Sequence, residues 1–145
     1  MIDISAKTPT KRVAIASGKI RMSKTAFDAL IKGKSPKGDV LGTAKVAGIM
    51  AAKNTPTIIP MCHSLELSKV SVSFKPDKKK STITIASEVS CLGRTGVEME
   101  ALTAVSVAAL TIYDMMKWAD KAMVISDVKL LLKTGGKSGI YKRKQ

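Results

Sequence analysis

Residues 67–118 read LSKVSVSFKPDKKKSTITIASEVSCLGRTGVEMEALTAVSVAALTIYDMMKW, and this stretch decides the fold. Apolar residues recur along residues 67–74, a pattern that predicts a β-strand. Pro76-Asp77-Lys78 supplies turn residues, and the alternating residues 82–89 predict a second strand that returns beside the first. The stretch therefore begins with a β-hairpin.

The longest apolar segment follows this hairpin. Thr95 and Glu98 have the three-residue spacing of a capping box, which predicts a helix running from there to about Trp118. The uncharged residues 101–113 within it are too few to cross a bilayer, which takes about 20 apolar residues. We therefore expect a buried core helix.

The flanking segments predict two further strands. Residues 11–22 have an interrupted extended pattern around Gly18, typical of a strand or a strand pair with a bend. Residues 123–132 are rich in Val, Ile and Leu and predict the last strand, ahead of a glycine-rich end.

Two helices are predicted between the first strand and the hairpin. Ser23 is an N-cap residue for a helix ending at Lys32, and Asp39 caps a second helix ending at Asn54. The order is then β-α-β-β-α-β with one extra helix, which indicates an α+β, ferredoxin-like fold: an antiparallel sheet with helices on one face. We expect residues 1–145 to form a single catalytic domain, with flexible ends at about 1–10 and 136–145.

Composition narrows the class of protein. Hydrophobic residues make up 45% of the chain, which excludes a disordered protein. The net charge of +14 attracts anions, whether nucleic acid, membrane headgroups or phosphorylated metabolites. The first residues lack the pattern of a signal peptide, so a cytoplasmic location is expected. Cys62 and Cys91 match no metal or redox spacing, so we expect reduced thiols and no metal site.

Candidate binding residues surround the only histidine. His63 follows Met61 and Cys62 in a predicted loop, where binding groups concentrate, although a lone histidine is more often structural. Capping and the helix dipole explain Glu98 but not Glu100. A carboxylate at position 100 is suited to accept the N–H donors of a guanine-like ring edge.

A second candidate lies at the other end of the same helix. Asp114 and Lys117 are spaced i,i+3 and share one face, as an ordinary surface ion pair would. Apolar neighbours on that face, Leu110 and Trp118 among them, suggest instead that the pKa of Lys117 is lowered toward the range useful for proton transfer. The two residues are then a candidate acid–base pair.

Lysines near the end of the chain suggest phosphate binding. The segment Gly136-Lys137-Ser138 resembles part of a P-loop, but Leu131 stands where that motif needs glycine. We reject a P-loop and keep the weaker expectation that glycine backbone flanked by Lys133 and Lys137 wraps phosphate.

The two candidate sites are far apart on one helix. At about 1.5 Å per residue, Glu100 and Asp114 are roughly 21 Å apart along the axis. One nucleotide-sized ligand hardly reaches both. If both ends act together, the sites are composite and the protein is an oligomer.

Several motifs together resemble the MoaC family, the cyclic pyranopterin monophosphate synthases of molybdenum cofactor biosynthesis. They are KGDV (37–40), AGI (47–49), IPMCH (59–63), TGVEMEALTA (95–104), IYDM (112–115) and KTGGKS (133–138). The similarity covers residues 2–139, and the TGVEMEALTA run is the most specific part. Ser64 stands where proline is expected, and Arg94 where lysine is usual.

The resemblance implies a lyase that converts 3',8-cyclo-7,8-dihydroguanosine 5'-triphosphate into cyclic pyranopterin monophosphate and releases pyrophosphate. It implies a homohexamer, built as a trimer of dimers with sites at subunit interfaces. No cofactor is implied, although magnesium can accompany the triphosphate. By motif position, Lys37, Lys117 and Asp114 would be catalytic. Substrate-binding residues would be Met61, Cys62, His63, Met99, Glu100, Lys53 and Lys133.

Two other classes of protein also fit the charge, and the lysine-rich turn 75–80 favours the first of them, but neither fits the other features. A basic RNA-binding protein of the same fold would carry aromatic residues on exposed strands, where only Phe74 is found. A phosphate-sensing regulatory domain leaves the pair Asp114 and Lys117 unexplained. We therefore expect a small-molecule substrate, with neither nucleic acid nor membrane as partner.

Overall fold

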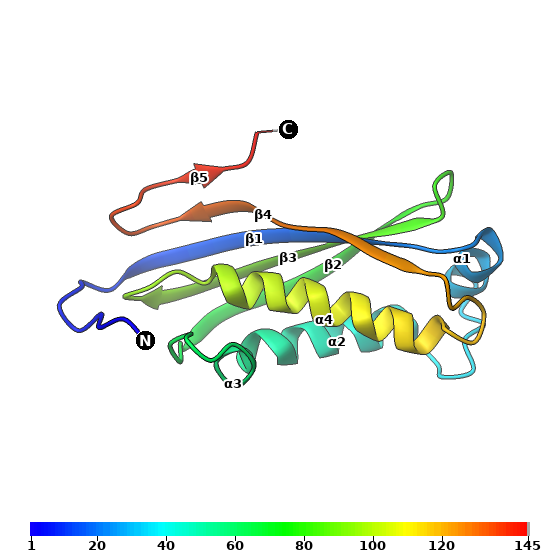
Figure 1. Ribbon diagram of the computed structural model, residues 1–145, viewed down its shortest axis with the longest axis horizontal. Coiled ribbons are helices and arrows are strands. Elements are labelled where there is room, and N and C mark those ends of the chain that lie inside the picture. The colour runs from blue at the N-terminus through cyan, green and yellow to red at the C-terminus, as the bar shows by residue number, and fades with distance from the viewer. Residues whose placement is uncertain (145) are drawn as a thin grey trace.

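A computed structural model describes residues 1–144. Its five strands form one antiparallel sheet in the order β2-β3-β1-β4-β5 (Figure 1). Their bounds are β1 Thr10–Arg21, β2 Leu67–Asp77, β3 Thr82–Gly93, β4 Val124–Thr134 and β5 Tyr141–Lys142. The predicted α+β, ferredoxin-like fold is confirmed.

The hairpin formed by β2 and β3 agrees with the sequence pattern. Asp77 pairs with Thr82 at the turn and Leu67 with Cys91 at the open end, so β3 runs four residues beyond its predicted end. Alternate residues of β3 point into the core, where Ile83 and Ile85 are fully buried.

The first two helices begin where predicted. Helix α1 (Lys24–Ile31) is capped by Ser23, whose side chain accepts from the N–H of Ala26, and α2 (Val40–Lys53) by Asp39, which accepts from Gly42. The one-turn helix α3 (Thr55–Ile58) was not predicted.

Helix α4 spans Glu98–Met116, so its first residue lies three positions after Thr95, the predicted N-cap. The capping box prediction is wrong: Val97 is the N-cap, and within the described chain no side chain caps this helix. The Glu98 carboxylate instead folds back against Gly96, in the space that a Cβ would occupy. Helix α4 is also long and apolar enough to span a bilayer, but here it is the core helix of the sheet.

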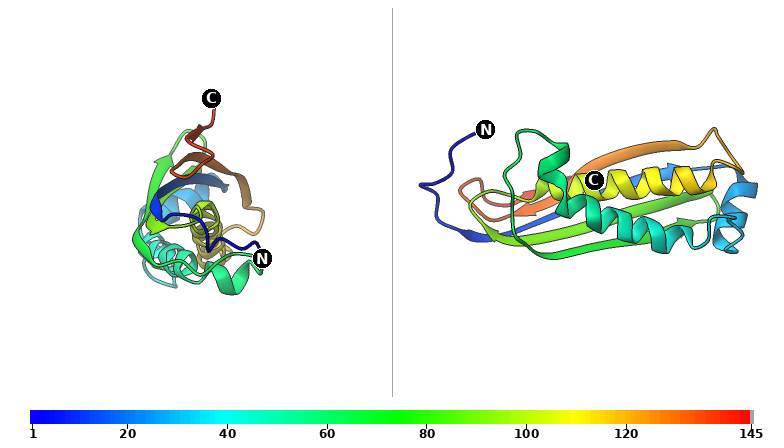
Figure 2. Two further views of the ribbon diagram at one scale, coloured as in Figure 1. Left: turned by 90° about the vertical axis from the view of Figure 1, so that its left-hand side faces the viewer. Right: turned by 90° about the horizontal axis from the view of Figure 1, so that it is seen from below.

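Helices α2 and α4 cover one face of the sheet side by side, and α1 lies at one end (Figure 2). Helices α2 and α4 approach each other closely because small residues line their contact. A Cβ on Gly48 of α2 would lie 2.9 Å from the carbonyl oxygen of Ala104 in α4. The core between helices and sheet is accordingly built from Ala, Val, Ile and Met.

Strand β1 is one continuous strand, not a strand pair, and it pairs with β3 in unbroken register. Its register with β4 shifts between Ser17 and Lys19. A Cβ on Gly18 would lie 2.6 Å from Cγ1 of Val105, so glycine allows α4 to pack against the strand. The extra residue lies in β4, because Ser17 and Lys19 pair with Lys129 and Ser126, so the β-bulge belongs to β4 and lies opposite Gly18.

The chain ends at the sheet edge. After the glycine-rich turn, Leu132 pairs with Lys142 and Lys133 with Tyr141, which forms the unpredicted β5. The expected flexibility of residues 1–10 and 136–145 stays a prediction, and Gln145 lies outside the described residues.

Candidate active site

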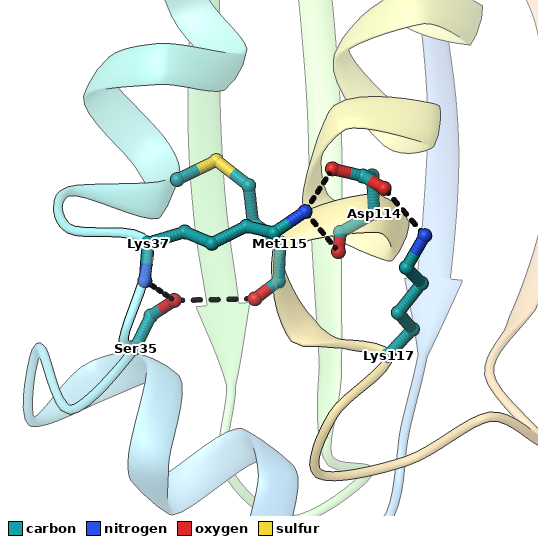
Figure 3. A network of polar contacts seen from close by, with 5 residues as sticks. All are labelled: Ser35, Lys37, Asp114, Met115 and Lys117. Carbon is teal, nitrogen blue, oxygen red and sulfur yellow. Dashed lines mark hydrogen bonds and ion pairs between the residues drawn. The ribbon is translucent and has the colours of Figure 1, made fainter.

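Three side chains form an ion cluster at the C-terminal end of α4 (Figure 3). The Oδ1 atom of Asp114 is 2.7 Å from Nζ of Lys117, and its Oδ2 atom is 2.6 Å from Nζ of Lys37. Lys37 comes from the loop between α1 and α2, so the cluster joins residues 77 positions apart. The structure thus brings together all three predicted catalytic residues.

Within this cluster, the carboxylate and the ammonium groups each stabilise the charged form of the other. Hydrogen bonds from Lys117 and then Lys37 lower the pKa of Asp114 to about 2. The same contact with Asp114 raises the pKa of Lys117. The expectation that apolar neighbours lower the pKa of Lys117 is wrong, because its side chain is 52% exposed and paired with a carboxylate. In this state both partners are charged.

A pocket of about 850 Å³ opens at the opposite end of α4. Five cationic side chains and one carboxylate line it: Lys7, Arg12, Arg94, Lys133, Lys137 and Glu98. The turn 134–138 forms one wall, and the side chain of Lys133 contacts Ser138 across this turn. Clustered cations beside glycine backbone suit a phosphorylated ligand.

Arg12 holds this pocket together from inside the fold. Its side chain is only 8% exposed, and its guanidinium donates to the carbonyl oxygens of Gly93 at 3.1 Å and Arg94 at 3.3 Å. The guanidinium also lies against Gly136, where any Cβ would collide with it. A buried charge is tolerated because these contacts satisfy it.

The buried carboxyl group of Glu100 lies in the first turn of α4. Its side chain is 3% exposed, and burial raises its pKa. Burial and then the nearby Glu100 raise the pKa of the thiols of Cys62 and Cys91. Raised thiol pKa values disfavour thiolate nucleophiles, so neither cysteine is suited to covalent catalysis.

His63 is held by the N-terminal segment. Its Nε2 atom lies 2.8 Å from the carbonyl oxygen of Ile2. Because a carbonyl only accepts, Nε2 is the donor in this contact. The exposed Met61 also lies beside this segment, with its sulfur 3.8 Å from the amino group of Met1. The segment continues through Lys7 into the pocket wall.

The predicted substrate-binding residues do not all meet. Lys133 lines the large pocket, and Glu100 and Met99 lie near it at the start of α4. Lys53 instead lines a smaller groove of about 420 Å³ between the end of α2 and the start of β2. Among residues 1–144 no group of three or more His, Cys, Asp or Glu side chains is placed to hold a metal ion.

Comparison with known proteins decides the family. The model of the MoaC family matches residues 1–136. The chain belongs to the MoaC family.

Curated relatives of this MoaC chain carry the name cyclic pyranopterin monophosphate synthase. The protein from Desulfatibacillum aliphaticivorans is 57% identical over 141 residues, covering 97% of this chain and 89% of the relative. The protein from Heliobacterium modesticaldum is 54% identical over 145 residues, covering 100% and 91%. The protein from Pelotomaculum thermopropionicum is 51% identical over 144 residues, covering 99% and 85%.

Sequence reasoning missed Lys7 and Arg12 of this MoaC chain as candidate site residues. A signal for Arg12 was present: it is in phase with the inward-facing Ala14 and Ala16, where a strand that packs on a core rarely carries a charge. Lys7 precedes the first strand and has no such signal.

Proposed function

We propose that this chain is a cyclic pyranopterin monophosphate synthase. It is a lyase that converts 3',8-cyclo-7,8-dihydroguanosine 5'-triphosphate into cyclic pyranopterin monophosphate and pyrophosphate, in molybdenum cofactor biosynthesis. The family match over residues 1–136 carries the proposal. The ion cluster and the cationic pocket support it, since the reaction needs both proton transfer and phosphate binding.

Lys37 and Lys117 serve as acid and base. Rebuilding a purine into a pterin requires ring opening, condensation and ring closure, and each of these steps moves protons. Asp114 orients both ammonium groups, because each of its oxygens holds one of them. When substrate displaces Asp114 from one of the lysines, that lysine loses the contact that favours its protonated, charged form. It can then give up a proton more easily.

The cationic pocket binds the triphosphate. In forming the cyclic phosphate, a hydroxyl oxygen bonds to the α-phosphorus, its proton passes to a base, and the bond to the β-phosphate breaks. Pyrophosphate leaves with more negative charge than it carried, so cations such as Lys133 and Lys137 stabilise the transition state. Magnesium can travel with the triphosphate, and no resident cofactor is proposed.

Glu100, in the first turn of α4, binds the base of the nucleotide. The carboxyl group of Glu100 accepts N–H donors of the guanine-derived ring. Substrate contacts are also proposed for Met61, Cys62, His63 and Met99. Lys53 keeps its proposed phosphate role only if its groove meets the site of another subunit.

The active site is composite, and the protein is an oligomer, proposed as a hexamer built as a trimer of dimers. The acid–base cluster and the pocket lie at opposite ends of α4, on which Glu100 and Asp114 are about 21 Å apart along the axis. Val46, Met50 and Leu110 on the outer faces of α2 and α4 are each more than half exposed, which suits contact with a second copy. An antiparallel second copy would bring one cluster to the other's pocket. We propose a cytoplasmic location for this oligomer.

The function is tested by incubating the purified protein with the cyclised nucleotide. Pyrophosphate and a pterin product should form in equal amounts. If neither forms while a known synthase turns over in parallel, the proposed function is wrong.

The composite site is tested by mixing two inactive variants, Lys117→Ala and Lys133→Ala, and refolding them together. In a two-site dimer, half of the assemblies are mixed and each regains one complete site, so about a quarter of wild-type activity should return. A mixture that stays inactive, or a monomeric active protein by light scattering, contradicts the composite site.

A further inference from the structure

The loop between α1 and α2 contains a buried serine. Ser35 is 9% exposed, although Lys34 and Pro36 on either side are exposed. A hydroxyl without partners is costly to bury, so this position needs hydrogen bonds. Ser35 has two: its Oγ donates to the carbonyl oxygen of Met115 at 3.1 Å and accepts from the backbone N–H of Lys37 at 3.2 Å (Figure 3).

These bonds join the loop to the end of α4. The last carbonyls of a helix have no partner within it, and α4 ends at Met116. The carbonyl of Met115 accepts from Ser35, and the carbonyl of Asp114 lies 3.4 Å from Nζ of Lys37. Two successive carbonyls of the final turn are therefore bound by one short loop.

The contact between Lys37 and Asp114 depends on the attachment of this loop to α4. The ammonium group of Lys37 sits on a flexible four-carbon stem, so the contact with Asp114 is specific only if the backbone at Lys37 is held in place. Gly38 follows in a turn closed by its N–H onto the carbonyl of Ser35, with a φ of 88° that favours glycine. The Ser35 hydroxyl is the link between this turn and the helix.

We propose that Ser35 is a positioning residue for the reaction. Its hydroxyl fixes the backbone of Lys37 against Met115, so that Lys37 and Lys117 share the carboxylate of Asp114. The expected effect on turnover rests on the proposed function. The expected effect on the titration of Asp114 does not.

The first test compares Ser35→Ala with Ser35→Thr. Loss of the hydroxyl should lower kcat ten- to a hundredfold, the cost of a misplaced catalytic group, and leave KM within about twofold. Ser35→Thr keeps a hydroxyl and should recover most of kcat. Ser106→Ala is the matched control, because Ser106 also donates to a carbonyl of α4, that of Leu102, but lies midway along the helix.

The second test reads Asp114 directly by NMR titration of its carboxyl carbon. Ser35→Ala should raise the pKa of Asp114 from about 2, because Lys37 is one of the two lysines that lower it. Ser106→Ala should leave this titration unchanged. In a Lys37→Ala background, Ser35→Ala should change neither kcat nor the titration further, since the residue it positions is gone.

An unchanged Asp114 titration in Ser35→Ala overturns the proposal. So does a Ser35→Ala substitution that lowers kcat by the same factor in wild type and in the Lys37→Ala background. If Ser35→Ala does not fold, Ser35→Cys keeps the size with a weaker donor and allows the same comparisons. A wild type without turnover refutes the proposed function, and the titration still decides the role of Ser35.

Discussion

Lys117 and Asp114 lie about one turn apart at the end of α4, with Nζ of Lys117 2.7 Å from Oδ1 of Asp114. This contact is local, because residues spaced i,i+3 share a helix face. The other oxygen of Asp114 is occupied by Lys37 from a distant loop. The carboxylate is therefore the point at which a local pair becomes a three-residue cluster.

Removing either lysine of the cluster should abolish most turnover. In Lys37→Met and Lys117→Met the stem is kept and the ammonium is lost, so kcat should fall by about 10²- to 10⁴-fold, the usual contribution of acid–base catalysis. Pyrophosphate release measures this. Lys121→Met, an exposed lysine near the same helix end, should keep wild-type kcat, and equal losses in all three variants would point to a charge effect instead.

The pairing of Asp114 should make stability depend on pH at the acid end. Its pKa of about 2 lies below the ordinary value near 4, so its stabilising contribution is present above about pH 4 and is lost as the pH falls through about 2. Thermal unfolding of Asp114→Asn should therefore show a smaller drop in Tm over that range than wild type. The difference should be small because the cluster is half exposed. If Tm falls with pH by the same amount in both proteins, Asp114 does not contribute this pH dependence.

Replacing Glu100 should separate stability from binding. Burial raises its pKa, so the ionised carboxylate opposes folding increasingly as the pH rises above about 4.3 through the raised value. Glu100→Gln should raise Tm at pH 7 and leave it unchanged near pH 4. The same change should raise KM about tenfold or more, because a charged acceptor is lost. Glu66→Gln, at an exposed position, should change neither quantity.

The turn in the pocket wall should tolerate alanine at one glycine and not at another. Gly136 and Gly139 both have positive φ values, 77° and 64°. A Cβ at position 136 collides with Arg12, whereas at position 139 it meets open space. Gly136→Ala should therefore cost at least about 1 kcal/mol more in the free energy of unfolding than Gly139→Ala, and should weaken substrate binding. Urea unfolding and KM check both, and equal costs would mean that only the backbone angle matters.

Much of the fold followed from hydrophobic periodicity. The β2–β3 hairpin was predicted from recurring apolar residues on either side of a turn, and α4 from the longest apolar segment of the chain. The capping box failed because Glu98 folds back on Gly96, a choice between two local contacts that spacing alone does not resolve. Strand β5 has two residues, and its pairing with β4 depends on the turn that returns the chain.

The site was predicted unevenly for a related reason. Spacing on one helix suggested Asp114 with Lys117, whereas Lys37 was assigned by family resemblance alone. No local pattern places Lys37 beside Asp114, because their contact depends on how α2 and α4 pack. The pocket was anticipated only through Lys133 and Lys137, since Lys7 and Arg12 reach it from the other end of the chain.

Arg12 also couples two walls of the pocket. One guanidinium binds the carbonyls of Gly93 and Arg94 and lies against Gly136, so one side chain links the segments 93–96 and 133–138. Loops held by separate contacts fluctuate independently, whereas loops sharing one attachment open together. The amide hydrogens of these two segments should therefore exchange with solvent at a common rate, as one cooperative unit.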